Sequence, residues 1–268
     1  MPELPDLEVF KTNIYNRLTS KRLAGLEVFN PQKVRIPREA LPEAYVGRDL
    51  LRIERFGKEL FFDFGDRRTI AAHLMLNGEI SIVAQEAVGA IRFKIFALRF
   101  ERETIVFSDR GGLCTIRYMP PADRTPDAFG ASFTWDYFLL AARAKSRVNV
   151  KAFLIDQKVV KGIGNAYADE ILWAARISPH SLVGMIPQDR LKDLYQAIGT
   201  VLHEAVEAIK RISPDIISGE ERSFLKVHNK LLRKTQSGYP IRVERIASKI
   251  TYYTGEQILY AQGATLQK

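Results

Sequence analysis

The spacing of apolar residues changes along the chain and predicts different structures in its two halves. Leu7, Phe10, Ile14 and Leu18 recur at helical spacing and predict a short amphipathic helix just after the first residues. From about residue 25 to 119, short β-branched and aromatic runs alternate with turn signals. We expect strands at 50–56, 60–64, 69–74, 79–83, 92–100 and 104–107. Several short strands at close spacing are typical of a β-sandwich or flattened barrel.

The second half follows a stretch rich in proline and short polar residues, 120–127, which we interpret as an interdomain linker. Helices are expected at 135–144, 149–155, 166–175 and 189–212, and a two-stranded hairpin at 242–247 and 249–253. The fold class is therefore α+β. The expected division is a β-sandwich domain with a leading helix at 1–120, a linker at 121–132, a helical domain at 133–220 and a hairpin finger at 221–268.

Composition narrows the class of partner. With 268 residues, 46% of them hydrophobic, the chain can build two cores. Its 40 Lys and Arg against 31 Asp and Glu give a net charge of +9, which suits a polyanion, although an ordinary basic enzyme has the same balance. The single cysteine, Cys114, excludes an internal disulfide and a cysteine-built zinc site. No apolar run reaches the ~18 residues of a membrane helix, so we expect a cytoplasmic protein.

The first residues offer a nucleophile. If Met1 is removed, Pro2 becomes a free secondary amine that can attack an electrophilic carbon and form an iminium. An α-amino group has a reference pKa of roughly 7.7 to 8.0, so part of it is neutral near pH 7. Glu3 stands beside it as a group that can move protons. The alternative is that Met-Pro reflects only processing of the chain end.

Four further positions are candidates, and each has a plainer alternative. Lys58 follows a glycine at a strand start, where an ammonium can meet a phosphate, but a surface lysine looks the same. His73 precedes an Asn-Gly turn that would project Leu76, and a lone His is commonly structural. The stretch 109–113 is read as a flexible hairpin tip. Asn165 follows two glycines before a helix, which predicts either a phosphate site or a helix cap.

The end of the chain carries much of the positive charge. Residues 221–268 contain nine Lys and Arg against three acids, a balance of +6. Lys249 lies at the tip of the predicted hairpin, with Tyr252 and Tyr253 close by. Basic and aromatic residues together are typical of a nucleic-acid contact, and a solvated hairpin is the alternative.

These motifs, in this order, resemble the formamidopyrimidine-DNA glycosylase and endonuclease VIII family of base-excision repair enzymes. The opening Pro-Glu-Leu-Pro is matched by residues 2–5, the Gly-Lys strand by Gly57-Lys58 and the His-Leu-x-Met-Ser-Gly tip by residues 73–78. Residues 151–170 resemble the helix-two-turn-helix signature of the family. That match is long and specific.

The resemblance implies an activity and roles for individual residues. Pro2 would attack C1′ of a nucleotide flipped out of damaged double-stranded DNA, Glu3 would act as acid and base, and Lys58 would be a cation at the phosphate and sugar. Lys151 matches a lysine near the damaged base, and Asn165 an asparagine that binds backbone phosphate. No cofactor or metal is implied. We expect a monomer, associated with the nucleoid if the source is bacterial.

The sequence also departs from the family pattern. The four zinc-binding cysteines of the family fall on Lys234, Ser237, Thr254 and Gln257, which predicts a zincless finger. The arginine of the finger tip falls on Lys249, which keeps the charge without the bidentate fork.

The residues expected to fill the duplex next to the lesion differ as well. Leu76 replaces the usual methionine, and Gly111 and Leu113 replace the usual arginine and phenylalanine. Asp6 replaces the commoner glutamate. Two alternatives stay open: a catalytically inactive or lyase-only homologue that binds abasic or distorted DNA, and an enzyme for oxidised pyrimidines instead of oxidised purines.

Overall fold

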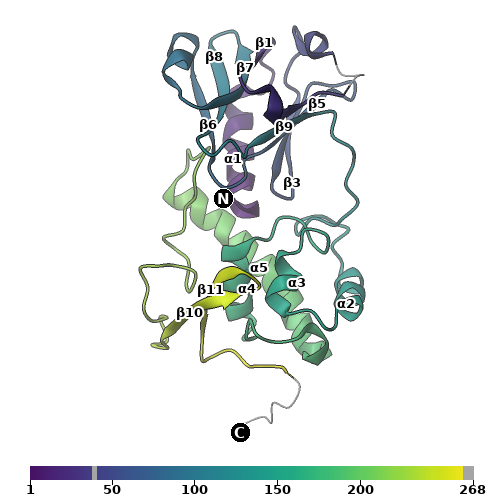
Figure 1. The fold of residues 1–268 in the computed structure, drawn as a ribbon, viewed down its shortest axis with the longest axis vertical. Helices are drawn as coiled ribbons and strands as arrows, with labels where there is room; N and C mark the ends of the chain where they lie inside the picture. Colours follow the sequence, from purple (N-terminus) through teal and green to yellow (C-terminus); the bar gives the residue numbers. More distant parts are fainter. Residues whose placement is uncertain (38–40, 262–268) are drawn as a thin grey trace. The chain divides into compact units, whose positions relative to one another are not determined.

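A computed structural model describes residues 1–37 and 41–261 of the chain (Figure 1). The contacts divide it into two units. Unit 1 contains Met1–Asp123 and Ile209–Glu220, and unit 2 contains Arg124–Ala208 and Glu221–Lys268. The division into domains that we expect from the sequence, at 1–120, 133–220 and 221–268, stays a prediction about independently folding parts. Across the described ranges, no helix is both long and apolar enough to cross a membrane.

Unit 1 is built from helix α1 and two sheets. Its elements are α1 (Leu4–Leu18), β1 (Leu23–Val28), η1 (Pro31–Lys33), β2 (Val34–Arg35), η2 (Pro42–Tyr45), β3 (Arg52–Phe56), β4 (Glu59–Asp63), β5 (Thr69–His73), β6 (Gly78–Ala84), η3 (Gln85–Ala90), β7 (Lys94–Phe100), β8 (Glu103–Asp109) and β9 (Thr115–Tyr118). One sheet has the order β1-β7-β8-β6 and the other β2-β9-β5-β4-β3. All pairs are antiparallel except β2 with β9.

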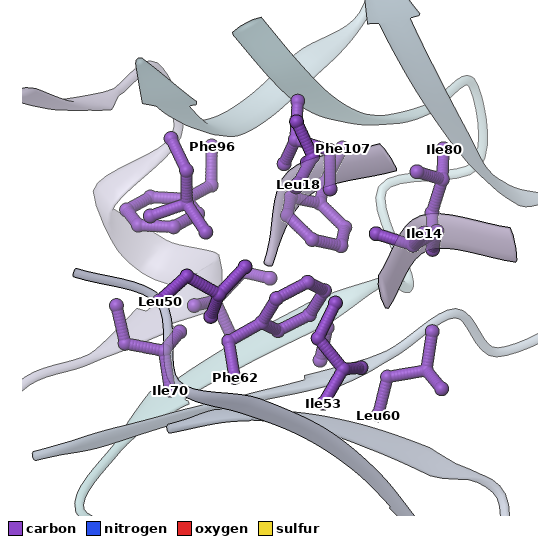
Figure 2. Packing of buried hydrophobic residues seen from close by; sticks show 14 of the residues in the cluster. Ile14, Leu18, Leu50, Ile53, Leu60, Phe62, Ile70, Ile80, Phe96 and Phe107 are labelled. Atoms are coloured by element: carbon purple, nitrogen blue, oxygen red, sulfur yellow. The ribbon is translucent and has the colours of Figure 1, made fainter. Parts of the chain in front are cut away.

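The two sheets of unit 1 face each other across one apolar core (Figure 2). Phe62 of β4 meets Phe107 of β8 edge to face, with ring centroids 5.7 Å apart, and Phe96 of β7 meets Tyr118 of β9 at 6.0 Å. Ile14 of α1 belongs to the same core and is fully buried. Burying each such side chain contributes about 1.5 to 3 kcal/mol, so helix and sheets stabilise one another.

Unit 2 combines helices with a two-stranded hairpin. Its elements are α2 (Trp135–Ala144), α3 (Val150–Ile155), α4 (Asn165–Ala174), η4 (Val183–Met185), α5 (Gln188–Ile212), whose end from Ile209 groups with unit 1, β10 (Ile241–Ile246) and β11 (Lys249–Thr254). The Gln157 side chain holds the turn between α3 and α4. It donates to the Ile155 and Ile163 carbonyls at 3.0 and 2.8 Å and accepts from the Gly162 N–H at 3.1 Å.

The α+β class with a β-sandwich, a helical part and a hairpin is confirmed. Three strands were not predicted from the sequence. Strand β1 is mostly half-exposed and so lacks a clear apolar pattern, and β2 and β9, with two and four residues, are too short to give one. The expected turn at Asn77-Gly78 does not close a hairpin: β5 and β6 belong to different sheets, so this loop crosses between them. Gly78 is required there, since a Cβ would lie 2.2 Å from the Leu74 carbonyl oxygen.

Candidate active site

The segment that carries Pro2 and Glu3 is fixed by the start of α1. Glu3 is the N-cap residue in an extended conformation, and its backbone N–H donates to Asp6 Oδ2 at 2.8 Å. The Glu3 side chain in turn faces the Asp6 amide, which completes a capping box. Pro2, Glu3 and Asp6 are all buried. In the structure Met1 is attached to Pro2, so the Pro2 nitrogen is an amide.

Lys58 occupies the tight turn between β3 and β4. Phe56 pairs with Glu59, so Gly57-Lys58 forms a two-residue loop, and Gly57 takes φ +60°, which glycine adopts without strain. Arg55 braces this turn: its Nε donates to Glu8 Oε2 of α1 at 2.8 Å and its Nη1 to the Gly57 carbonyl at 3.3 Å. The Arg55 side chain is only 4% exposed. One guanidinium therefore joins the helix that follows Pro2 to the turn that carries Lys58.

The pKa of Glu8 is consistent with its ion pair to Arg55. Burial raises the pKa of the Glu8 carboxyl, but the hydrogen bonds and charges of Lys11 and Arg55 outweigh it and bring the pKa below its ordinary value. Glu8 is thus a carboxylate at neutral pH and holds Arg55 as an ion pair. The sequence pattern did not identify Arg55 or Glu8, because a charged residue in a strand or a helix is normally taken for a surface residue.

The two apolar tips project as expected. Leu76, between β5 and β6, is 58% exposed, and Leu113, between β8 and β9, is 39% exposed. Gly78 pairs with Asp109, so both loops leave the same end of the four-stranded sheet. His73 has a local contact, since its Nδ1 accepts from the Met75 N–H at 3.0 Å.

The loop after β8 is not the flexible tip that the sequence suggested. The Asp109 carboxylate accepts from the backbone N–H groups of Gly111, Leu113 and Cys114 at 2.7, 2.6 and 2.7 Å. Asp109 is itself buried. Three charge-assisted hydrogen bonds fold the loop around one carboxylate and present Leu113 in a defined direction.

Lys151 and Asn165 lie in unit 2, where both contact the hairpin. Lys151 is fully buried, and its Nζ is 2.7 Å from Asp169 Oδ1 and 2.6 Å from Thr251 Oγ1. Asn165 Nδ2 donates to the Ile250 carbonyl at 2.9 Å. The expected contacts of these two residues with DNA stay predictions. In this conformation the Lys151 ammonium is enclosed by the chain, so a base contact would require Asp169 and Thr251 to release it.

Asp169 and Glu170, the last two residues of the 151–170 signature, bind the hairpin and residues 226–228. Asp169 Oδ2 accepts from the Tyr252 N–H at 2.9 Å and contacts His228 Nδ1 at 2.6 Å. The Glu170 carboxylate accepts from three successive backbone N–H groups, those of residues 226–228, at 2.7 to 3.0 Å. Burial raises the pKa of Glu170 despite these three bonds. The motif thus specifies tertiary contacts, a role that spacing alone did not reveal.

The hairpin turn places Lys249 at an exposed tip. Ala247 and Ser248 both have positive φ, +50° and +62°, which is the geometry of a type I′ turn. Neither is glycine, so this tip stores backbone strain, a feature that recurs at functional positions.

A carboxylate organises the base of the hairpin. The Glu256 carboxylate accepts from Trp173 Nε1 at 3.0 Å, Ser237 Oγ at 2.8 Å and Thr254 Oγ1 at 3.2 Å, and it pairs with Arg176. Its side chain is 7% exposed. Burial raises the pKa of Glu256, yet these hydrogen bonds and the Arg176 charge bring it down to about 2. In the described residues no group of three His, Cys, Asp or Glu side chains is arranged to hold a metal ion.

Comparison with known proteins identifies the family. The model of the formamidopyrimidine-DNA glycosylase N-terminal domain matches residues 1–115, and that of the H2TH domain of the same enzyme matches residues 125–215. The formamidopyrimidine-DNA glycosylase of Acidithiobacillus ferrooxidans is 30% identical over 275 residues, which cover 96% of this chain and 99% of the relative. This chain belongs to the formamidopyrimidine-DNA glycosylase family. The enzyme of Carboxydothermus hydrogenoformans is 29% identical and covers 86% of this chain and 89% of its own length.

Solved structures agree on the fold. The formamidopyrimidine-DNA glycosylase of Lactococcus lactis, crystallised non-covalently bound to DNA with an abasic site, has a TM-score of 0.82 at 22% identity, with 96% of this chain and 99% of that chain covered. A complex of the same relative with DNA and an inhibitor gives a TM-score of 0.84 at 23% identity, with 96% and 100% covered.

Proposed function

We propose that this chain removes oxidised bases from double-stranded DNA and nicks the strand at the abasic site through a Schiff base on Pro2. Family membership makes it a DNA glycosylase of base-excision repair with an associated lyase activity. The observation that carries the residue assignment is the Arg55 brace, because it fixes the Lys58 turn to the helix that begins directly after Pro2 and Glu3. A DNA partner implies a nucleoid location if the source is bacterial.

The chemistry requires removal of Met1, which frees the Pro2 nitrogen as a secondary amine. The neutral amine attacks C1′ of the flipped nucleotide, the glycosidic bond breaks with its electrons on the leaving base, and loss of the ring oxygen from C1′ gives an iminium. Glu3 supplies the proton for sugar opening. The iminium then acts as the electron sink for elimination: a base removes a proton from C2′, a C2′–C3′ double bond forms, and the C3′–O bond breaks so that the 3′ phosphate leaves. Lys58 contributes a positive charge beside the phosphate and sugar.

We assign DNA binding to six residues in two groups. In unit 1, Leu76 and Leu113 project as apolar wedges next to the lesion, and His73 holds the backbone of the first wedge through Met75. In unit 2, Lys249 supplies a phosphate contact from the exposed hairpin tip. Lys151 and Asn165 bind that hairpin at Thr251 and Ile250. We therefore assign them two roles, positioning of the hairpin and the DNA contact expected from the family.

Borohydride trapping on an abasic-site duplex tests the assignment, with mass spectrometry of the intact protein to establish that Met1 is absent. We expect a covalent adduct that maps to Pro2. Pro2→Gly retains a terminal amine but makes it primary and more mobile, so it should bind the duplex within about threefold and form much less adduct. Equal trapping by Pro2→Gly, or an adduct on another residue, would contradict the nucleophile assignment.

The alternative is a homologue that binds abasic or distorted DNA without catalysis. It is favoured by the departures from the family pattern at the two loop tips, Leu76 and Leu113, and by Lys249 in place of the arginine of the finger tip. Met-free protein that binds the duplex and forms no adduct would establish this alternative. The choice between oxidised purines and oxidised pyrimidines is decided by excision from matched duplexes; the Lactococcus lactis relative has been crystallised with DNA that contains an oxidised pyrimidine.

A further inference from the structure

An acidic side chain from a distant part of the sequence reaches the chain terminus. In the structure the α-amino group of Met1 forms an ion pair with Glu220 Oε1. Residues 1 and 220 belong to the same unit. The Met1 and Glu220 side chains are 28% and 33% exposed, so water reaches the pair but does not surround it.

The segment that carries Glu220 is attached to α1 and the sandwich. Asn13 Nδ2 of α1 donates to the carbonyls of Pro214 and Ile216, both at 2.8 Å. The Ser218 hydroxyl accepts from the Ile80 N–H of β6 at 3.0 Å. Ile216 and Ile217 also pack against the core of unit 1. The position of Glu220 near the terminus is therefore set by contacts that do not involve Met1.

Removal of Met1 shifts the terminal nitrogen by one residue, about 3.8 Å along the chain. Pro2 is buried ahead of the capping box, so its nitrogen keeps its place. The Glu220 side chain is long and partly exposed, so rotation about its torsions can move its carboxylate towards the new terminus. An amine next to a carboxylate holds its proton more tightly, because the ammonium is stabilised.

Other charged groups lie on the elements that pack around the start of α1. They are Glu3, Asp6, Glu8 and Lys11 on the helix, Arg55, Lys58 and Glu59 on β3, β4 and their turn, and Asp215 with Glu220 in the segment after α5. Glu8 forms ion pairs with both Lys11 and Arg55, and Glu59 pairs with Arg117. The contact of Glu220 with the terminal amine is a direct ion pair.

We propose that Glu220 is the counter-ion of the Pro2 amine in the processed enzyme and sets the pH at which this nucleophile becomes neutral. The inference rests on the proposed role of Pro2 and adds a residue that tunes it. Glu220 also stabilises the positive iminium after attack. It thus lowers the reactivity of the free amine at acidic pH and supports the intermediate once it has formed.

The test is the pH dependence of borohydride trapping by Met-free protein on a saturating abasic-site duplex. Glu220→Gln removes the charge and keeps the size of the side chain. The trapping rate should rise with pH as the amine loses its proton, and we call this rising part of the profile the acid limb. We expect Glu220→Gln to move the acid limb to lower pH by about 0.5 to 1 unit, the size of shift that one partly exposed charge produces. One unit below the wild-type midpoint, the ratio of the rate to its own plateau should rise about two- to fivefold. The plateau itself should equal or fall below that of the wild type.

Glu221→Gln is the matched control, because it makes the same change of net charge at the next residue, whose carboxylate accepts from the Ser223 N–H. Its acid limb should coincide with the wild type. If the acid limb of Glu220→Gln coincides with those of the wild type and of Glu221→Gln, the proposal is overturned. Trace acetylation of the terminal amine without DNA provides the pKa of Pro2 directly and should shift in the same sense. Absence of any adduct in wild-type protein would instead contradict the nucleophile assignment.

Discussion

Replacing Glu256 by glutamine tests whether one carboxylate holds the base of the hairpin. The wild-type side chain accepts hydrogen bonds from Trp173, Ser237 and Thr254 and pairs with Arg176. Glutamine keeps one acceptor oxygen, replaces the other by an N–H group that faces donors, and removes the charge. Hydrogen bonds to a charged group contribute about 1.5 to 3 kcal/mol each, whereas the pair with the half-exposed Arg176 adds at most about 1 kcal/mol.

We expect Glu256→Gln to lower the free energy of opening of the hairpin by about 2 to 3 kcal/mol. Hydrogen exchange of the amides in β10 and β11, followed by mass spectrometry, measures this opening locally. Glu244→Gln is the control on the same hairpin, since Glu244 pairs with His180 at a site where both side chains are about two-fifths exposed, and it should change the free energy by less than about 1 kcal/mol. Equal exchange in the two variants would refute the role of Glu256.

The pH dependence has a definite sign. The pKa of Glu256 is about 2 in the folded protein and near 4.5 when the group is unperturbed, so the native carboxylate binds its proton less readily. Its contribution to stability is fully present above about pH 4.5 and is lost as the pH falls towards 2. Exchange in the wild-type hairpin should therefore accelerate over this window relative to Glu256→Gln, which lacks the titrating group. Parallel pH profiles would contradict the assignment of the low pKa.

Two further predictions concern placement and affinity. Arg55→Lys keeps a positive charge, but lysine cannot reach both Glu8 and the Gly57 carbonyl. The trapping rate should therefore fall about tenfold, while DNA affinity stays within about threefold of the wild type. An unchanged rate would show that Arg55 does not position Lys58. Lys249→Ala removes one phosphate contact, so binding should weaken for all sequences and the slope of log K against log salt should drop by about one unit, measured by fluorescence anisotropy. An unchanged slope would place Lys249 off the DNA.

The sequence predicted the parts of the fold that depend on local pattern. Helices α2 and α5 begin and end within one residue of the expected positions, and so does the hairpin, because periodicity and a tight turn fix them locally. Strand β9 was missed because its four residues become a strand only through pairing with β5 and β2. The Asn-Gly turn in the loop at 73–78 was recognised from the sequence, but a turn signal does not state which sheet receives the next strand.

The same distinction between local and long-range information applies to the residues of the candidate site. Pro2, Glu3 and Lys58 could be proposed from the sequence, because a terminal amine and a Gly-Lys turn are each recognised from a few adjacent residues. Arg55 and Glu220 were not found, since the importance of each depends on a partner more than forty residues away, at Glu8 or at the terminus. Acidic or basic side chains of this kind are indistinguishable from surface charges until the fold brings their partners close.

Glu256 was the hardest residue to recognise from the sequence, because its role is related to the absence of the zinc-binding cysteines of the family. In the usual family pattern a zinc ion joins two segments through four cysteines, and the corresponding positions are occupied here by Lys234, Ser237, Thr254 and Gln257. Glu256 lies between the last two, and its carboxylate binds Ser237 of the first segment and Thr254 of the second. Like a metal ion it collects several ligands around one charge, but of the opposite sign, so hydroxyl and N–H donors replace thiolates. A hairpin held in this way should keep its hydrogen-exchange protection in the presence of a chelator, which would open a zinc-bound finger, whereas acid should weaken both.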